Sequence, residues 1–458
     1  MPQPEARSFA RLLALLAFVW VASASGLLSS NDGSHLALAR ALALRGETTI
    51  EPDRALTLGV DLSLRDDRVY SDRPPGTAFT ALLAVWLGDR LDPAALARAQ
   101  EQVRAGDDVH PLPACPPYIS TYAKRFPAAP PLAKRIATSV LIGLHAALMG
   151  LLALVLLERM LVALGLAREA RRFAIAGLGL ATLLGPYSTA LYAHVPSATM
   201  VSGFLLGVLA LRRHADASTR AQAIALATGL AGAWAVACDY LLALAIVPTT
   251  LLALPWRRWP LVLLGTLPIA LATLAYHDAA FGSPFAIGYD FHATFEFARS
   301  RGETFDGDML EGLWILLGSG RGAGMLAQSP LALVGLVVLV VVALRDPQRR
   351  ELGLLALGFV PWLLALACHE TPWGGGTDDH RYLIPLLPLA GLGLALAWAR
   401  AGLLAKAVLL LLALASAWRV WSHFTSWREV GLLESPLLGL FAALLVLLAA
   451  ELAARRAR

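Results

Sequence analysis

The chain has 458 residues, of which 57% are apolar and 16% are charged. Soluble globular proteins have about 45–50% apolar and about 25% charged residues, so this composition excludes an ordinary soluble domain and indicates a polytopic membrane protein. The net charge of +5 comes from basic residues clustered at the ends of hydrophobic runs, so it indicates membrane orientation rather than a nucleic-acid partner. The three cysteines are scattered and form no C-x-x-C pair, so the sequence indicates no disulfide framework and no cysteine-based zinc site.

The first hydrophobic run, Arg7 to Gly26, has a basic start, an apolar centre and small residues at its end. A secretory signal peptide is built in the same way. We predict an uncleaved membrane anchor instead, because Asp32 follows the run so closely that it would lie at the membrane surface.

Later hydrophobic runs predict a large helical bundle. A helix needs about 20 mostly apolar residues to cross the hydrocarbon core, and about twelve runs, some of them short, approach this length. We therefore predict an all-α bundle of about twelve transmembrane helices, formed by one integral-membrane domain over residues 1–458. The predicted spans cover approximately residues 9–28, 136–157, 173–193, 196–212, 221–237, 239–254, 259–279, 327–344, 351–368, 382–398, 405–421 and 435–453.

Clusters of basic residues predict the orientation of these spans. The clusters all fall on one side of the membrane if the N-terminus is inside, as the positive-inside rule requires. Both termini are therefore predicted in the cytoplasm, and the loops 29–133, 280–326, 369–381 and 422–434 outside. The clusters are Arg168, Arg171 and Arg172; Arg212, Arg213 and Arg220; Arg257 and Arg258; Arg345, Arg349 and Arg350; Arg400 and Lys406; and Arg455, Arg456 and Arg458.

The first outer loop contains the longest run rich in ionisable groups, from Asn31 to Gly76. Its carboxylates and cations, among them Asp66, Asp67 and Arg68, are expected against the membrane surface, where they could act on a charged, lipid-attached substrate. Composition alone favours a solvated loop that joins two spans. We nevertheless interpret this run as the active-site loop, because its motifs resemble those of a known family. The rest of the loop, from Asp92 to Arg135, is a polar insert with several prolines and is expected to be irregular.

Two short helices are expected on the outer face within this loop. Thr77 to Leu91 is apolar but short, and counting it as a span would turn every later basic cluster outward, so we predict a juxtamembrane or re-entrant helix. Pro74 and Pro75 suit its start, because proline is tolerated in the first turn of a helix. His35 to Arg45 places apolar residues on one stripe with Arg40 elsewhere, the pattern of a helix lying along the interface.

Asp32 follows the first span in an Asn-Asp-Gly sequence. One interpretation is a turn residue, or an N-cap for a helix that opens at Ser34. The other is a general base at the rim of a cavity, which would take the proton from an acceptor hydroxyl as that oxygen attacks a sugar carbon. The motif by itself leaves both interpretations open.

Arg73 stands directly before the double proline, so its guanidinium is presented at a defined depth. A planar guanidinium suits bidentate capture of a phosphate. The alternative is an interface anchor for the following helix, with Asp72 as its ion-pair partner. Two further arginines, Arg321 in a glycine-rich stretch and Arg381 in the 369–381 loop, are expected on the same side of the membrane.

With Asp32 and Arg73-Pro74-Pro75 in this order, the sequence resembles the GT-C superfamily of polytopic glycosyltransferases. Within it, the likeness is to the protein O-mannosyltransferase and lipid-A aminoarabinose transferase-like group, which uses polyprenyl-phosphate sugars. In that group an Asp soon after the first span is followed by a basic-Pro-Pro motif that opens a juxtamembrane helix. Further matches are Phe281 to Phe285 leading to Gly288-Tyr289, Gly318 to Gly322 before Gln328 to Pro330, and Trp373 to Gly375 before Arg381 to Leu383 and Pro385.

Two positions depart from the pattern of the group. Gly33 follows Asp32 where a second acid is common, so a second carboxylate comes from elsewhere or is not needed. The last motif, from Gly374 to Leu383, reads GGGTDDHRYL in place of an aromatic-rich run, which leaves the donor specificity open.

Histidines and carboxylates gather in the 369–381 loop, and such a cluster can ligate a metal. No two of them form an i, i+4 pair on a predicted helix, and the resemblance implies no general metal dependence. We therefore expect no metal and no other cofactor to be required, with a divalent metal as the open alternative. The cluster comprises His369, Glu370, Asp378, Asp379 and His380.

The resemblance implies a role for each candidate residue. Asp32 would be the catalytic base, and Arg73, Arg321 and Arg381 would bind the donor phosphate. His194 lies at the outer end of a predicted span, where a membrane-interface residue is the alternative interpretation. Residues expected to bind substrate are His35, Tyr70, Asp72, His194, Tyr289 and Tyr382.

The implied activity is transfer of a hexosyl or pentosyl group, with inversion, from a polyprenyl-phosphate donor to a hydroxyl or amine. The acceptor, whether glycan, lipid or protein, would lie on the outer face of a bacterial plasma membrane. A lipid-linked sugar flippase or transporter is the competing class, but it should show charges or Gly/Pro breaks at mid-membrane in paired halves. An O-antigen ligase or polymerase would need its principal loop late in the chain.

Overall fold

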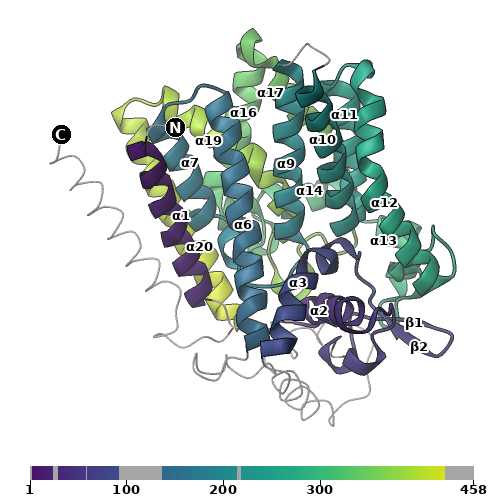
Figure 1. The fold of residues 1–458 in the computed structure, drawn as a ribbon. Coiled ribbons are helices and arrows are strands. Elements are labelled where there is room, and N and C mark those ends of the chain that lie inside the picture. The colour runs from purple at the N-terminus through teal and green to yellow at the C-terminus, as the bar shows by residue number, and fades with distance from the viewer. Residues whose placement is uncertain (1–2, 24–28, 58, 92–136, 214–217, 429–458) are drawn as a thin grey trace.

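The computed structural model describes residues 3–23, 29–57, 59–91, 137–213 and 218–428 (Figure 1). These residues form a bundle of helices with one small two-stranded hairpin, which confirms the predicted all-α polytopic fold. In the described part, seven helices are long and apolar enough to cross a membrane, or eight if the bent pair Met309–Gln328 and Pro330–Arg345 is one span. The total of twelve spans stays a prediction, because the last predicted span, 435–453, lies outside the described residues.

The first described elements are one long helix and a layer of short elements. The hairpin pairs Ser63 with Tyr70 and Arg65 with Arg68 in antiparallel register. These elements are α1 (Gln3–Ser23), α2 (Ser30–Arg40), the π-helical turn η1 (Ala41–Arg45), the 3₁₀ turn η2 (Glu51–Thr57), β1 (Ser63–Arg65), β2 (Arg68–Tyr70) and α3 (Gly76–Leu91).

The middle of the chain forms the centre of the bundle. Its helix boundaries follow local signals: the Ser218 side chain caps α10, Asp239 caps the turn η4, and Gly282 ends α12 with a left-handed backbone. The elements are α6 (Ala137–Ala163), α7 (Arg168–Ala181), α8 (Leu184–Tyr187), α9 (His194–Arg213), α10 (Thr219–Cys238), η4 (Tyr240–Leu242), α11 (Ala243–Ala253), η5 (Trp256–Arg258) and α12 (Trp259–Phe281).

The last part alternates short turns with apolar helices. The helix axis bends by 86° between Met309–Gln328 and Pro330–Arg345, at Ser329, which directly precedes the proline that opens the second helix. The elements are η6 (Gly288–Phe291), η7 (Glu296–Arg299), α13 (Arg301–Thr304), α14 (Met309–Leu317), η8 (Gly320–Gly322), α15 (Met325–Gln328), α16 (Pro330–Arg345), η9 (Pro347–Arg349), α17 (Arg350–Gly358), α18 (Val360–Ala367), η10 (Gly375–Thr377), η11 (Arg381–Leu386), α19 (Leu387–Arg400) and α20 (Leu403–Arg428).

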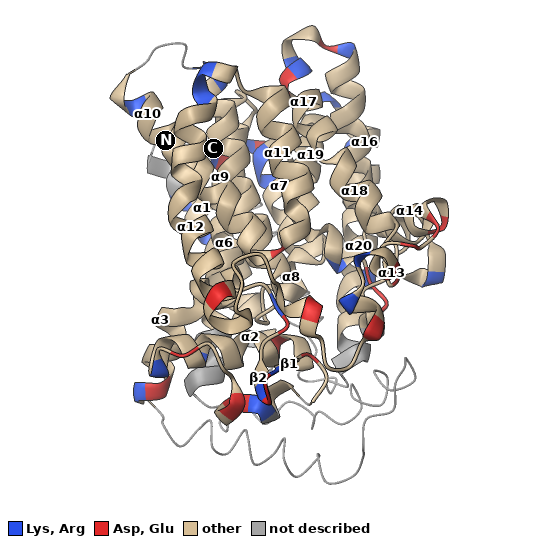
Figure 2. Cartoon of the chain, turned by 90° about the vertical axis from the view of Figure 1, so that its right-hand side faces the viewer, with Lys and Arg blue, Asp and Glu red and all other residues tan. Residues whose placement is uncertain are grey.

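Eleven of the predicted spans overlap helices in the described part of the chain, although not each of these helices is long enough to cross a membrane; apolar runs form helices because a bilayer offers no other partner for their backbone groups. An ion pair between Arg171 and Glu5 ties the first basic cluster to the N-terminal end of α1. The charged residues gather mostly at the two ends of the bundle, and the end that carries α2, β1 and α13 has both signs (Figure 2).

Glycines allow the closest helix crossings in the bundle. A Cβ atom added to Gly229 of α10 would overlap the backbone of Val262 in α12, and one added to Gly393 of α19 would overlap the backbone of Gly335 in α16. Helices in membranes associate by such close packing, since lipid offers no hydrophobic driving force between them. The scattered small residues of these apolar runs therefore fix which helices are neighbours.

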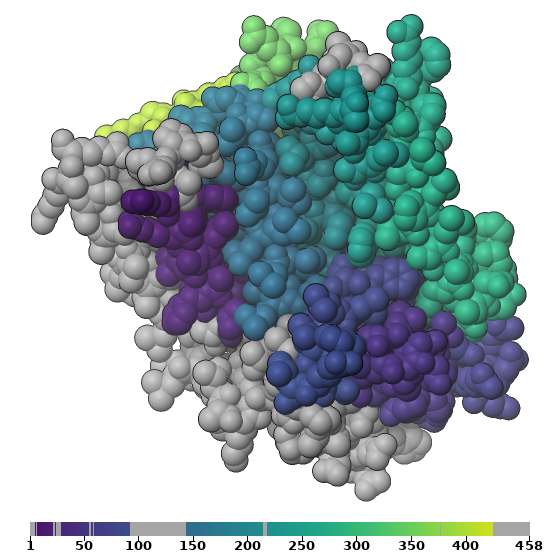
Figure 3. All heavy atoms as spheres, viewed as in Figure 1, coloured from purple at the N-terminus to yellow at the C-terminus, as the bar shows by residue number. Residues whose placement is uncertain are grey.

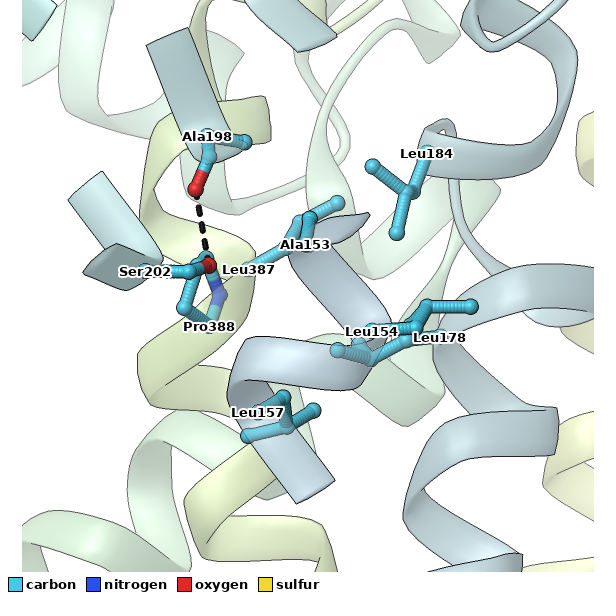
Figure 4. Close-up of a pocket in the computed structure, with 9 residues that line it drawn as sticks. All are labelled: Ala153, Leu154, Leu157, Leu178, Leu184, Ala198, Ser202, Leu387 and Pro388. Atoms are coloured by element: carbon cyan, nitrogen blue, oxygen red, sulfur yellow. Dashed lines mark hydrogen bonds between the residues drawn. The ribbon is translucent and has the colours of Figure 1, made fainter. Parts of the chain in front are cut away.

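A small pocket lies inside the bundle, between α6, α7, α8, α9 and α19 (Figure 4). It encloses about 10 Å³, room for at most one water molecule. The hydroxyl of Ser202, the one polar side chain in its lining, donates a hydrogen bond to the carbonyl of Ala198 at 2.8 Å. The pocket is therefore a packing defect rather than a place for a sugar or a lipid.

The short elements α2, α3, β1 and β2 form a cap over one end of the bundle (Figure 3). Both helices predicted for the first outer loop are present, but α2 is buried on every side from Asp32 to Arg40, so the predicted interfacial face is wrong. Arg40 can be buried because Asp53 and Asp89 pair with it at 3.1 and 3.2 Å, which offsets the cost of removing the charge from water.

Candidate active site

Five segments that are distant in sequence meet under the cap. They are the start of α2, the turn before α3, the turn η6, the start of α9 and the turns η10 and η11. Each contributes at least one buried or half-buried polar side chain. The helices α2 and α3 lie at one end of the bundle (Figure 1). The bundle thus builds one polar cluster from loops on a rigid helical frame.

Asp32 is buried and belongs to the capping structure of α2. Its carboxylate accepts hydrogen bonds from the backbone N–H of Ser29 at 2.7 Å and from the Ser29 hydroxyl at 3.1 Å. Ser29 is the N-cap and Asp32 stands three residues inside the helix, so the predicted helix start at Ser34 is wrong by four residues. The capping interpretation of Asp32 is confirmed in this modified form, and the base assignment stays a prediction.

The capping structure is joined to the rest of the cluster by Tyr192. The Tyr192 hydroxyl lies 2.6 Å from the Ser29 hydroxyl, and the Tyr192 ring lies under the guanidinium of Arg381, 5.6 Å from ring centre to Cζ. A chain of side-chain contacts therefore runs from Asp32 through one serine and one tyrosine to Arg381.

Arg73 is held between two carboxylates. It forms an ion pair with Asp61, and its Nε lies 3.2 Å from Oδ2 of Asp72. The side-chain oxygen of Asn31, in the amide orientation that satisfies its neighbours, accepts from Nη1 and Nη2 of Arg73 at 3.3 and 3.1 Å. The ion pair that the sequence left as an alternative for Asp72 is present, and Asp61 adds a second one.

Asp72 is completely buried, and its surroundings keep it ionised. Burial raises the pKa of Asp72, but the charge of Arg73 and the hydrogen bonds of His292 and Ser34 outweigh it and lower the pKa to about 2. Ser34 donates to Asp72 at 3.0 Å, and Nε2 of His292 lies 3.5 Å from Asp72. The turn before α3 therefore carries a negative charge beside Arg73 at neutral pH.

Tyr289 is brought to Arg73 by a close contact between two backbones. A Cβ atom at Gly288 would lie 2.7 Å from the carbonyl oxygen of Asp72, so only glycine permits this approach. Arg73 lies within electrostatic range of the phenols of Tyr289 and Tyr382. Burial raises the pKa of Tyr289, so its hydroxyl keeps its proton and remains a hydrogen-bond donor at neutral pH.

Arg381 lies in an aromatic setting. Its Cζ is 5.3 Å from the centre of the Tyr382 ring and 5.6 Å from that of Tyr192. Its guanidinium donates a hydrogen bond to the Thr377 hydroxyl. The carboxylate of Asp379 does not pair with this guanidinium; it accepts hydrogen bonds from the backbone N–H of Arg381 at 3.0 Å and from a tyrosine hydroxyl at 2.6 Å. Arginine stacks well on aromatic faces, and here its charge is not neutralised by a direct ion pair among the described residues.

His35 and His194 belong to the same buried cluster as the two arginines. His35 is completely buried, and burial together with the charge of Arg73 lowers its pKa to about 3. His194, at the first position of α9, is 7% exposed, and its ring packs against those of Tyr192 and Tyr382. It is therefore part of the cluster rather than an exposed residue of a membrane-interface belt.

Other residues of the predicted site lie elsewhere. Arg321 is half-exposed, pairs with Asp378 at 3.2 Å and stacks on Trp373, so its place around the donor phosphate stays a prediction. Tyr70 packs on Phe281 in the core of the cap, with ring centres 5.6 Å apart, and its substrate-binding role also stays a prediction.

The hairpin turn does not join the buried cluster. Asp66 and Asp67 adopt left-handed backbone conformations in the exposed turn between β1 and β2, and Arg68 is exposed beside them. These three residues therefore lie outside the buried cluster around Arg73, because a tight hairpin projects them away from it, and their place against the membrane surface stays a prediction.

The histidine and carboxylate cluster of the 369–381 loop has other partners. Nε2 of His380 lies 2.7 Å from the Ser329 hydroxyl, its Nδ1 lies 3.1 Å from the Ala323 carbonyl, and Asp378 pairs with Arg321. In the described part of the chain, the ligand atoms with metal-like spacing are those of Asp61, Asp72 and His292, which lie within 4.8 Å of one another. The guanidinium of Arg73 already supplies the positive charge between these carboxylates.

Sequence reasoning missed Asp61 and His292. Asp61 stands between Val60 and Leu62, and His292 follows the run Tyr289-Asp290-Phe291. An isolated ionisable residue within an apolar or aromatic run is a signal of burial, and a buried charge needs a partner. That signal could have selected Asp61, although it could not have shown that Asp61 faces Arg73; it does not select His292, because Asp290 stands two residues before it.

Comparisons with known proteins support the fold. No protein-family model matches the sequence, and no curated protein matches it. The structure is similar to that of ArnT from Cupriavidus metallidurans bound to undecaprenyl phosphate, with a TM-score of 0.52 and 17% identity over 90% of this chain and 63% of that chain. The apo state of ArnT gives a TM-score of 0.53 and 16% identity over 89% of this chain and 62% of that chain.

At these identities the likeness concerns the fold alone. It confirms the predicted all-α polytopic fold, which is similar to that of ArnT. The chain spans less than two thirds of the length of ArnT.

Proposed function

We propose that this protein is a membrane glycosyltransferase that moves a sugar from a polyprenyl-phosphate donor to an acceptor hydroxyl or amine on the outer face of the membrane. The observation that carries the proposal is the meeting of Asp32, Arg73 and Arg381 at one end of an ArnT-like bundle. Apolar helices surround this end and would accommodate the lipid tail, while the buried arginines would hold its phosphate.

The two arginines fit the charge that develops during transfer. When the bond between the anomeric carbon and the phosphate oxygen breaks, both electrons stay on that oxygen, and the phosphate gains negative charge. Fixed cations in a dry site stabilise this charge more in the transition state than in the ground state. Arg381 would contribute most, because Arg73 is already offset by Asp61 and Asp72.

Asp32 would act as the base. The acceptor oxygen or nitrogen forms its bond to the anomeric carbon from the face opposite the phosphate, which inverts that centre, and its proton passes to the Asp32 carboxylate. The hydrogen bonds from Ser29 hold this carboxylate in one orientation, so proton transfer needs no rearrangement of the base.

The same features weigh against a flippase or transporter. Such a protein needs polar groups and broken helices near mid-membrane in paired halves. Here the candidate polar residues gather at one end of the bundle, under the cap. The bent pair α14 to α16 is one interruption without an observed counterpart in the described residues.

The experiment is transfer of labelled sugar from polyprenyl-phosphate mannose, glucose and arabinose in membranes that contain equal amounts of each variant. Wild type should transfer one of these sugars, and Asp32→Asn and Arg381→Gln should not. Asp66→Asn is a matched control, because Asp66 is an exposed acid of the same loop in the hairpin turn. Transfer that survives both site substitutions would refute the assignment.

A further inference from the structure

His35 is a buried histidine without a hydrogen-bond partner among the described residues. Both of its ring nitrogens are inaccessible to solvent and contact no donor or acceptor there, and its relative exposure is 0%. Buried polar atoms of native proteins are nearly always hydrogen-bonded, so an unpaired imidazole indicates a missing partner. Nδ1 of His194 and Nε of Arg381 are buried and unpaired in the same way.

These unpaired nitrogens are N–H donors or can become donors, whereas Oδ2 of Asp72, which is also buried and unpaired, already has Nε of Arg73 3.2 Å away. Both nitrogens of a protonated imidazole donate, and a guanidinium has no acceptor at all. The partner that would satisfy them is therefore an acceptor-rich anion. A lipid phosphate between Arg73 and Arg381 would supply such acceptors.

The net negative charge of the site makes binding of such an anion unfavourable. Among the described residues of the cluster there are four carboxylates, those of Asp32, Asp61, Asp72 and Asp379, and two guanidiniums, those of Arg73 and Arg381. The formal excess is two negative charges, to which a phosphodiester adds one more. An uncompensated charge is costly in a buried site, so a further positive charge should accompany the phosphate.

His35 is placed to carry this charge. The charged and titratable groups around it are Asp72 and Arg73 from the turn before α3, Asp61 through its ion pair with Arg73, and His194 from α9. Without the phosphate, burial and Arg73 keep His35 neutral, with a pKa of about 3. An anion beside the ring reverses this balance, because it stabilises the imidazolium.

We propose that binding of the lipid phosphate places one proton from solvent on His35, so that donor binding and proton uptake are linked. This inference rests on the proposed function, since it takes the phosphate of the donor as the ligand. The neutral imidazole gains the proton on its free nitrogen, and the imidazolium then donates hydrogen bonds to the phosphate. When the sugar leaves, the same imidazolium can return its proton to the phosphate oxygen that has gained the electron pair.

The test uses farnesyl methyl phosphate, a lipid phosphodiester whose single charge does not change between pH 5 and 8. Binding to the full chain in nanodiscs of zwitterionic lipid is measured by calorimetry in two buffers of different ionisation enthalpy, which gives the number of protons taken up. The affinity of wild type should rise as the pH falls, because protons favour the bound state. The limit of this rise is about tenfold per pH unit for one linked proton.

Two substitutions of His35 separate charge from shape. His35→Asn cannot take a proton and should bind weakly, with an affinity that changes less than about twofold over the pH range. His35→Arg carries its charge permanently, so it should bind tightly at pH 8 without proton uptake. His194→Asn is the matched control, because it removes a second buried and unpaired histidine of the cluster and should leave the proton uptake in place. Thermal unfolding of each variant shows whether it is folded.

The outcomes distinguish this inference from the proposed function. If wild type binds the phosphodiester tightly without proton uptake, the linkage to His35 is overturned and the glycosyltransferase proposal still stands. The same holds if proton uptake disappears with His194→Asn instead of His35→Asn. If wild type does not bind the phosphodiester at any pH, both proposals fall.

Discussion

Arg73 forms an ion pair with Asp61, and the two residues come from opposite ends of the β1–β2 hairpin region. The Arg-Pro-Pro motif indicates a phosphate ligand, yet the arginine is enclosed by Asp61, Asp72 and Asn31. A phosphate must therefore share or displace these partners to reach Arg73. Among the described residues, by contrast, the guanidinium of Arg381 is bonded only to a hydroxyl.

We expect Arg73→Ala to destabilise the fold by about 3–5 kcal/mol, because it leaves two buried carboxylates without their cation. The double variant Arg73→Ala/Asp61→Asn should recover part of this loss, since it removes one of the stranded charges. The measurement is the free energy of unfolding in detergent for wild type, both single variants and the double variant. Strictly additive effects would show that the pair is not coupled.

Asp32→Asn should lower transfer by about 10²–10⁴-fold, the contribution of a general base, while the donor still binds. Ser29→Ala is the matched control, because it removes the capping hydroxyl and costs about 1 kcal/mol of stability but keeps the carboxylate. Single-turnover rates and donor affinities are measured for both variants. If Ser29→Ala slows transfer as much as Asp32→Asn does, Asp32 acts through the helix cap and not as a base.

Arg381→Gln should lower kcat by about 10²–10³-fold, since it removes a preorganised cation from the leaving phosphate. Arg381→Lys keeps the charge but loses the planar stacking on Tyr192 and Tyr382, so its kcat should fall between those of wild type and Arg381→Gln. Arg419→Gln, on the exposed side of α20, is the control and should transfer at the wild-type rate. Equal rates for Arg381→Gln and Arg419→Gln would remove Arg381 from the site.

Two glycines should be intolerant of alanine because backbone lies against them. A Cβ at Gly76 would overlap the backbone of Ala237 in α10, and one at Gly288 would press on Asp72. We expect each Gly→Ala change to cost about 1–3 kcal/mol through overpacking. Gly402→Ala is the control, since a Cβ at Gly402 would meet no described atom within 4 Å, and it should be neutral in thermal unfolding.

The ion pair of Asp72 should make stability depend on pH in the acid range. Its folded-state pKa is about 2, below the ordinary value of 3.8, so its contribution is fully present above about pH 4 and is lost as the pH falls toward 2. The loss should be about 2 kcal/mol. The difference in unfolding free energy between wild type and Asp72→Asn should shrink from pH 5 to pH 2.5, and a constant difference would contradict the lowered pKa.

Much of the fold was predictable because the bilayer requires it. A long apolar run must form a helix in lipid, so the long apolar helices could be located from hydropathy alone, whereas α13 and α14 lie in the predicted outer loop 280–326. The surroundings of α2 could not be predicted in this way. Its pattern of apolar residues suits an interfacial helix, and only the partners of Arg40, which come from η2 and α3, allow it to be buried on all sides.

For the candidate site, local motifs selected residues but not their partners. Asp32, Arg73 and Arg381 could be chosen because each stands in a short pattern beside a predicted span. Asp61 and His292 stand in no such pattern, and their positions beside Asp72 and Arg73 depend on contacts between distant loops.

The sequence by itself determined the membrane class, the positions of the helices and the polar segments at one end of the bundle, because these follow from local hydropathy and short motifs. The tertiary structure decided which charges neutralise each other. It paired Arg73 with Asp61, left Arg381 among tyrosine rings and buried His35 without a partner among the described residues. Those outcomes depend on distances between side chains from separate loops, and electrostatic interactions in a dry interior are governed by such distances.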